Sequence, residues 1–241
     1  MDPELLRRTA DIAAEYLSSL PERPVRAEAS LDELRAALRV GLEDGSRPAL
    51  EVIEELVRAA DPGLVGTQSP RYFGFVIGGA LDAAIAADWL TSVWDQNGGG
   101  YPCGPSAAVV EEVACEWLLD ILGLPAEAGV GLTTGCQMAH FTCLAAARHR
   151  VLADAGWDVE ADGLFAAPPI RVFVGARAHA TVFAALRMLG LGGRRVELVA
   201  TDDQGRMRES ELARLLSCGE GPAIVIAQVG EVNTGAIDAV P

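Results

Sequence analysis

The sequence has 241 residues, half of them hydrophobic, and its 34 acidic residues against 19 basic ones give a net charge of −15. An acidic surface repels phosphodiester backbones, so nucleic acid is not expected as a partner. No apolar run reaches membrane-spanning length, and acidic residues near the start oppose a secretion signal, so we expect a cytoplasmic protein that binds no membrane.

The first 68 residues are predicted to form a helical N-terminal segment. Ser30 followed by Glu33 is a capping-box pair, which is typical of a helix start. Prolines and glycines separate the helices from one another. The predicted helices run from Pro3 to about Leu20, from about Ser30 onward, and from Pro48 to near Asp61.

Beyond residue 68, apolar helices give way to strands that alternate with helices. Helices are predicted at 81–96, 105–122, 136–152, 180–189 and 209–216, and strands at 129–133, 170–174, 195–200 and 223–229. This alternation predicts an α/β fold with a mainly parallel sheet and helices on both faces. The last strand is strongly apolar and would need a neighbour on each side, so we expect a sheet that is incomplete at its C-terminal side.

A small-residue turn between a predicted strand and a predicted helix is the most informative segment. It runs from Gly131 to His140. The start of such a helix offers unpaired backbone N–H groups and the positive end of a dipole, which suit a phosphate. Gly135 allows a close approach of the backbone, and Thr134 and Gln137 could add side-chain donors. Many α/β folds carry such a glycine without any ligand, so the turn alone leaves both interpretations open.

A histidine stands at the end of another predicted strand. His179 follows the strand at 170–174 and precedes a helix. Ligands of α/β sheets bind at this edge, and an imidazole there can lie flat on an aromatic cofactor ring. The alternative is a histidine that satisfies backbone groups at the helix start.

A third polar segment follows the strand at 223–229. Asn233 and Thr234 lie there in a loop bounded by Gly230 and Gly235. The loop belongs to the same edge of the predicted sheet, although an ordinary turn has the same composition.

Taken together, these segments resemble the group II pyridoxal phosphate-dependent decarboxylases, which include aromatic amino acid and glutamate decarboxylases. The resemblance covers about residues 69–241 in order, and residues 1–60 fit the family's helical N-terminal extension only loosely. It implies a fold-type I enzyme, with 69–241 as the first part of the large cofactor-binding domain. The matching segments are Pro70–Phe75, the helix with Glu111, Thr133–Ala139, Ala178–Val182 and Gly230–Gly235.

The resemblance also implies roles for individual residues. Pyridoxal 5'-phosphate would be the cofactor, an α-amino acid the substrate, and a homodimer the complete enzyme. His179 matches the catalytic histidine that stacks on the pyridine ring. The other cofactor-binding positions are Gly135, Cys136 and Gln137 at the phosphate, and Asn233 and Thr234 in the adjacent loop. The positions near the substrate entrance are Phe73, Phe75 and Tyr101, the last in a loop that would reach the partner subunit's site.

One requirement of that family is missing from the composition, because every basic residue other than histidine is arginine. The family holds its cofactor as a Schiff base on a lysine amine, for which arginine cannot substitute. We therefore expect a truncated piece that does not turn over by itself, although the complete enzyme would release an amine and carbon dioxide.

Other functions stay open at this point. Another fold-type I enzyme, such as an aminotransferase or an amino acid lyase, would share these segments. A non-catalytic fragment, or a subunit whose lysine comes from a second chain, would also fit. A dinucleotide-binding module is disfavoured because no GxGxxG follows a predicted strand. The five cysteines and three histidines lack zinc-type spacing, so no metal is expected.

Overall fold

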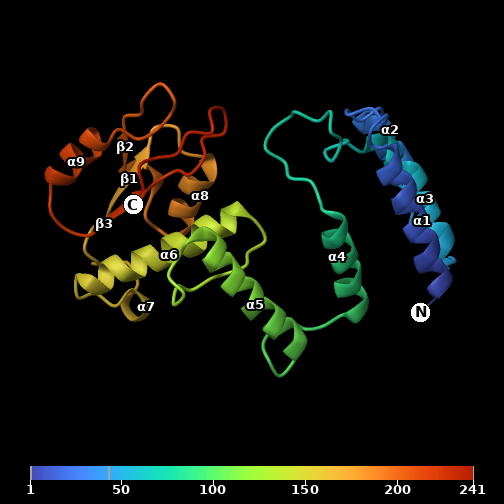
Figure 1. The fold of residues 1–241 in the computed structure, drawn as a ribbon, viewed down its shortest axis with the longest axis horizontal. Coiled ribbons are helices and arrows are strands. Elements are labelled where there is room, and N and C mark those ends of the chain that lie inside the picture. Colours follow the sequence, from blue (N-terminus) through green and yellow to red (C-terminus); the bar gives the residue numbers. More distant parts are fainter. Residues whose placement is uncertain (1, 43, 241) are drawn as a thin grey trace. The chain divides into compact units, whose positions relative to one another are not determined.

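A computed structural model describes residues 2–42 and 44–240 of the chain. These residues form two compact units, which meet in the chain between Gly104 and Pro105 (Figure 1). Each unit has its own packing and is described by itself. The predicted boundary after residue 68 concerns the complete enzyme and stays a prediction.

The first unit is helical. Asp2 caps the first helix by accepting a hydrogen bond from the backbone N–H of Glu4. The predicted capping box is confirmed, since Ser30 and Glu33 exchange hydrogen bonds between side chain and backbone. The elements are α1 (Pro3–Ser19), α2 (Leu31–Leu38), α3 (Ala49–Ala60), the 3-10 turn η1 (Asp61–Gly63) and α4 (Asp82–Trp94).

The second unit contains a parallel sheet of three strands in the order β2-β1-β3 (Figure 1). Val172 in the central strand is paired with Val196 on one side and with Ile224 on the other. The strands are β1 (Arg171–Gly175), β2 (Val196–Val199) and β3 (Ala223–Ile226). The helices are α5 (Pro105–Leu122), α6 (Cys136–Asp154), α7 (Val159–Asp162), α8 (Ala180–Met188), the 3-10 turn η2 (Gly193–Arg195) and α9 (Glu209–Ser217).

Helices cover both faces of this sheet, as the sequence predicts. Val172 and Val174 point to one face, where they pack with Leu144 of α6 and Leu186 of α8. Phe173 lies between them in sequence and points to the opposite face, where it packs against residues of α9. This alternation follows from the period of two in a strand. The buried valines and phenylalanine fix the sheet between the two helical layers.

One predicted strand is wrong. Residues 129–133 have no regular secondary structure and lead directly into α6. A strand is stabilised by ladder hydrogen bonds, and within residues 2–42 and 44–240 this segment pairs with no neighbour. Its apolar residue Leu132 is 59 % exposed. The predicted strand at 223–229 is also shorter, because β3 ends at Ile226 and Val229 makes an antiparallel bridge with Ile237.

Candidate cofactor site

The predicted site residues of the second unit follow the carboxyl ends of the parallel strands or open a neighbouring helix. His179 follows β1, a hairpin around Gly205 follows β2, and the loop 227–238 follows β3. Because all three strands are parallel, these connections emerge at one edge of the sheet. The start of α6 is hydrogen-bonded to the start of α8 at the same place.

The start of α6 offers donors with no acceptor. Gly135 is the N-cap residue and makes no side-chain capping bond. The backbone N–H groups of Cys136 and Gln137 have no partner in the described part of the chain. A Cβ atom built on Gly135 would meet no atom within 4 Å. An open space beside unpaired N–H groups at the positive end of a 19-residue helix fits a phosphate.

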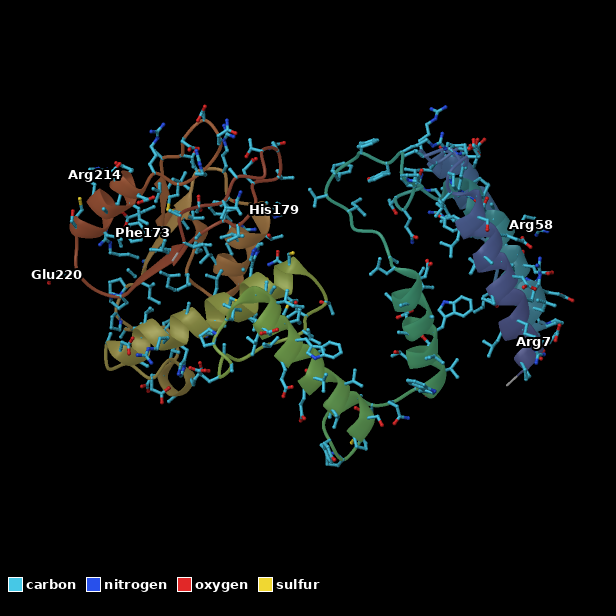
Figure 2. All side chains as sticks on the ribbon, in the orientation of Figure 1. Arg7, Arg58, Phe173, His179, Arg214 and Glu220 are labelled. Atoms are coloured by element: carbon cyan, nitrogen blue, oxygen red, sulfur yellow. The ribbon has the colours of Figure 1, made fainter. Side chains whose placement is uncertain are left out.

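Thr181 connects this turn to His179. The side-chain Nε2 of Gln137 donates to the backbone carbonyl of Thr181 at 3.4 Å. The hydroxyl of Thr181 lies 2.7 Å from Nδ1 of His179 and 3.0 Å from Nδ1 of His140 on α6. Thus the predicted phosphate turn and the predicted ring-stacking histidine lie together, and Figure 2 shows His179 at the end of α8 that lies beside the start of α6.

His179 both caps a helix and remains accessible to a ligand, the two alternatives that its position in the sequence left open. Its Nδ1 accepts the backbone N–H of Thr181 at 3.3 Å, so the imidazole caps α8. The side chain is nevertheless exposed, and its Nε2 has no hydrogen-bond partner among the residues that the structure describes. The capping bond orients the ring and leaves its outer nitrogen available to a ligand.

Asn233 and Thr234 lie at the same edge, in a loop organised by Glu231. Glu231 is 5 % exposed, and its carboxylate accepts the backbone N–H groups of Asn233 and Thr234 at 2.7 and 2.9 Å. The Asn233 side chain donates to Glu231, and the Thr234 hydroxyl donates to the carbonyl of Gln204 at 2.6 Å. The Asn233 side-chain hydrogen bond, with further help from the backbone N–H groups, lowers the pKa of Glu231.

No hydrogen bond joins Asn233 or Thr234 to His179 or to the turn at Gly135 within the described residues. The loops approach each other through Gly205 instead, whose φ is 92°. A Cβ atom there would lie 3.0 Å from Cγ of Glu231 and 3.3 Å from Cδ of Arg177. Gly205 therefore lies where the connections after β1, β2 and β3 meet.

Sequence reasoning missed Thr181, Glu231 and Asp238. Asp238 is 6 % exposed, and its carboxylate accepts the backbone N–H groups of Met207 at 2.6 Å and Gln228 at 2.7 Å. Glu231 accepts from Asn233 and Thr234, so its partners are local in the sequence. Thr181 and Asp238 also contact distant segments, through His140 and Met207, and the sequence does not reveal these contacts.

The three residues predicted at the substrate entrance lie in the first unit. Phe73, Phe75 and Tyr101 are 92, 94 and 62 % exposed. Their role beside the cofactor stays a prediction.

Within residues 2–42 and 44–240, no group of three histidine, cysteine or acidic side chains is arranged to hold a metal ion. The five cysteines are all unpaired thiols. In the same described ranges, none of the helices combines the length and the apolar character that crossing a membrane requires.

The fold is that of fold-type I pyridoxal phosphate enzymes. Residues 32–241 match the family described as "Pyridoxal-dependent decarboxylase conserved domain", and the chain belongs to this family. The predicted resemblance to group II decarboxylases is thereby confirmed, and pyridoxal phosphate is the family's cofactor.

Known relatives include decarboxylases of about twice this length. Tryptophan decarboxylase 1 of Oryza sativa subsp. japonica is 27 % identical over 98 % of this chain and 48 % of its own length. An aromatic-L-amino-acid decarboxylase of Bacillus atrophaeus is 27 % identical over 96 % of this chain and 47 % of its own. The chain therefore spans about half the length of the curated relatives it matches.

Solved structures agree with the fold. The Oryza sativa enzyme TDC, solved with PLP and tryptamine, has a TM-score of 0.85 at 25 % identity, over 98 % of this chain and 50 % of that one. The glutamate decarboxylase domain of a Vibrio parahaemolyticus protein has a TM-score of 0.88 at 22 % identity, over 98 % and 52 %.

Proposed function

We propose that these residues form the phosphate- and ring-binding part of a pyridoxal phosphate-dependent decarboxylase that acts on an amino acid. The unpaired N–H groups of Cys136 and Gln137 would hold the phosphate, and the imidazole of His179 would lie on the pyridine ring. The observation that carries the proposal is the joint contact of Gln137 and His179 with Thr181, which brings a phosphate cradle beside an exposed ring.

The residues that are present fit the cofactor in two respects. Open space at Gly135 admits a phosphate close to the backbone, and the helix dipole favours its charge. His179 is fixed at Nδ1 and open at Nε2, so its ring can be oriented before a ligand arrives. When bound, pyridoxal phosphate supplies an electron sink for the pair left by breaking the Cα–carboxylate bond.

The tethering amine would come from polypeptide outside these 241 residues. No residue of the sequence is lysine, and arginine remains protonated and non-nucleophilic in proteins. By themselves the 241 residues should therefore bind the cofactor reversibly and release no carbon dioxide from amino acids. The decarboxylase relatives support a carboxy-lyase rather than another fold-type I activity. The amino acid substrate, a homodimer and a cytoplasmic location are inferred from the resemblance and the acidic composition.

The test measures binding by equilibrium dialysis of the 241-residue chain against pyridoxal phosphate and against pyridoxal. We expect saturable binding of the phosphate ester, much weaker binding of pyridoxal, and competition by inorganic phosphate. Equal binding of both compounds would show that the start of α6 holds no phosphate.

Borohydride reduction followed by peptide mapping completes the test. The only primary amine in a lysine-free chain is the α-amino group at Met1, which serves as the background. A reduced adduct at any internal side chain would contradict the proposal that the tether lies elsewhere.

A further inference from the structure

The hydroxyl of Thr181 lies between two imidazoles from different helices. Its Oγ1 is 2.7 Å from Nδ1 of His179 and 3.0 Å from Nδ1 of His140. Both distances are within the hydrogen-bond range. His140 lies on α6, and this contact connects it to the candidate site.

The directions of these hydrogen bonds follow from counting protons. The backbone N–H of Thr181 points at Nδ1 of His179 at 3.3 Å, and an N–H can only donate. Nδ1 of His179 is therefore an acceptor and carries no proton. A neutral imidazole has one N–H, so the proton of His179 is on Nε2.

The same count of protons determines which nitrogen of His140 carries the proton. With no proton on Nδ1 of His179, the Thr181 hydroxyl has to be the donor in the 2.7 Å contact, so the single lone pair of Nδ1 is shared between this hydroxyl and the backbone N–H in a three-centre hydrogen bond. Oγ1 is then the acceptor towards His140, so Nδ1 of His140 donates. The result is a directed chain from His140 Nδ1–H through the Thr181 hydroxyl to His179 Nδ1.

We propose that His140 and Thr181 are positioning residues that hold His179 as the Nε2–H tautomer. This inference rests on the proposed function, because it assigns His179 a task towards the bound cofactor and amino acid. The chain fixes both the plane of the ring and the location of its proton. His179 then presents an N–H donor on its exposed side, suited to an anionic acceptor such as a substrate carboxylate.

The test is the tautomeric state of each histidine in the ¹⁵N-labelled 241-residue chain, measured at pH 8 by long-range ¹H–¹⁵N correlation. We expect the Nε2–H form at His179 and the Nδ1–H form at His140. Free histidine favours the Nε2–H form, so the state of His140 is the diagnostic observation. An Nε2–H form at His140, or an Nδ1–H form at His179, would overturn the inference.

Two matched variants separate positioning from general packing. Thr181→Val removes the hydroxyl, so His140 should revert to the Nε2–H form and the affinity for pyridoxal phosphate should fall roughly fivefold. Thr181→Ser keeps the hydroxyl and should restore both. His149, on the same helix but beside Glu160, is the internal control and should not change in either variant.

The results separate the positioning role of His140 and Thr181 from the proposed binding of pyridoxal phosphate. Unchanged affinity in Thr181→Val, with a measured change of tautomer at His140, would overturn the positioning role. Failure of the unmodified chain to bind pyridoxal phosphate, with the expected tautomers present, would overturn the proposed function and leave the hydrogen-bond chain standing.

Discussion

The carboxylate of Asp238 accepts the backbone N–H of Met207 at 2.6 Å, across 31 residues of sequence. Its second oxygen accepts the N–H of Gln228 at 2.7 Å. One buried side chain therefore fastens the hairpin after β2 to the loop after β3. The proposed cofactor edge of the sheet depends on this connection for its shape.

Replacing Asp238 by alanine is expected to lower the free energy of unfolding by about 2–3 kcal/mol, because a buried and a partly buried N–H group lose a charged acceptor. Urea unfolding followed by circular dichroism measures the change. Asp203→Ala is the matched control, since Asp203 is an exposed side chain, and it should change the stability by less than about 0.5 kcal/mol. Equal effects of both variants would show that Asp238 is not an anchor.

Glu231 makes a pH-dependent contribution to stability. Its pKa in the folded chain is lowered from an ordinary value of 4.5, chiefly by the Asn233 side chain. Between this lowered pKa and pH 4.5, the folded state therefore binds fewer protons than the unfolded state. The stabilisation is complete above pH 4.5 and is lost as the pH falls through the lowered pKa.

Carboxyl ¹³C NMR checks this directly by titrating Glu231 in the unmodified chain and in Asn233→Ala. We expect a midpoint below 4.5 in the unmodified chain and a higher midpoint in the variant. A midpoint that does not move would mean that Asn233 is not the main cause of the lowered pKa.

The backbone N–H of Cys136, rather than its thiol, is expected to bind phosphate. Cys136→Ala keeps this N–H and should change the affinity for pyridoxal phosphate by less than about twofold. Cys136→Pro removes the N–H at the first helical position, where proline is well tolerated. Loss of a hydrogen bond to a charged group should weaken binding by about 10- to 100-fold in equilibrium dialysis.

Both cysteine variants should unfold at a urea concentration close to that of the unmodified chain, which keeps the comparison free of folding effects. Equal affinity of the alanine and proline variants for pyridoxal phosphate would show that the Cys136 N–H at the start of α6 does not bind the phosphate.

Gly205 is expected to be intolerant of any side chain. Gly205→Ala adds a Cβ atom at a φ of 92° and within 3.0 Å of Glu231. Gly230→Ala is the matched control, because its φ is 96° but no atom lies within 4 Å of the added Cβ. We expect a loss of about 1 kcal/mol in Gly230→Ala and roughly 1–2 kcal/mol more in Gly205→Ala, measured by urea unfolding. Equal losses would mean that the loops do not pack closely there.

Much of the fold follows from local patterns in the sequence. The capping box at Ser30, the helix from Pro105 to Leu122 and the strand that contains Phe173 are confirmed, because local patterns in the chain mark each of them. The strand predicted at 129–133 is wrong, since a strand also needs a partner and periodicity does not reveal one.

The candidate site was predictable in part for the same reason. Gly135 and His179 stand at helix starts, which sequence marks well. Asp238 and Thr181 were missed, because each has a partner, Met207 or His140, that lies 31 or 41 residues away and that only the folded chain brings close.

Thr181 is hydrogen-bonded both to Gln137 at the proposed phosphate site and to His179, the proposed ring-stacking residue. A small displacement of α8 would therefore change the position of Gln137 at the phosphate site and the orientation of the His179 imidazole together. Tuning either one by mutation, whether in evolution or in the laboratory, should therefore require a compensating change in the other.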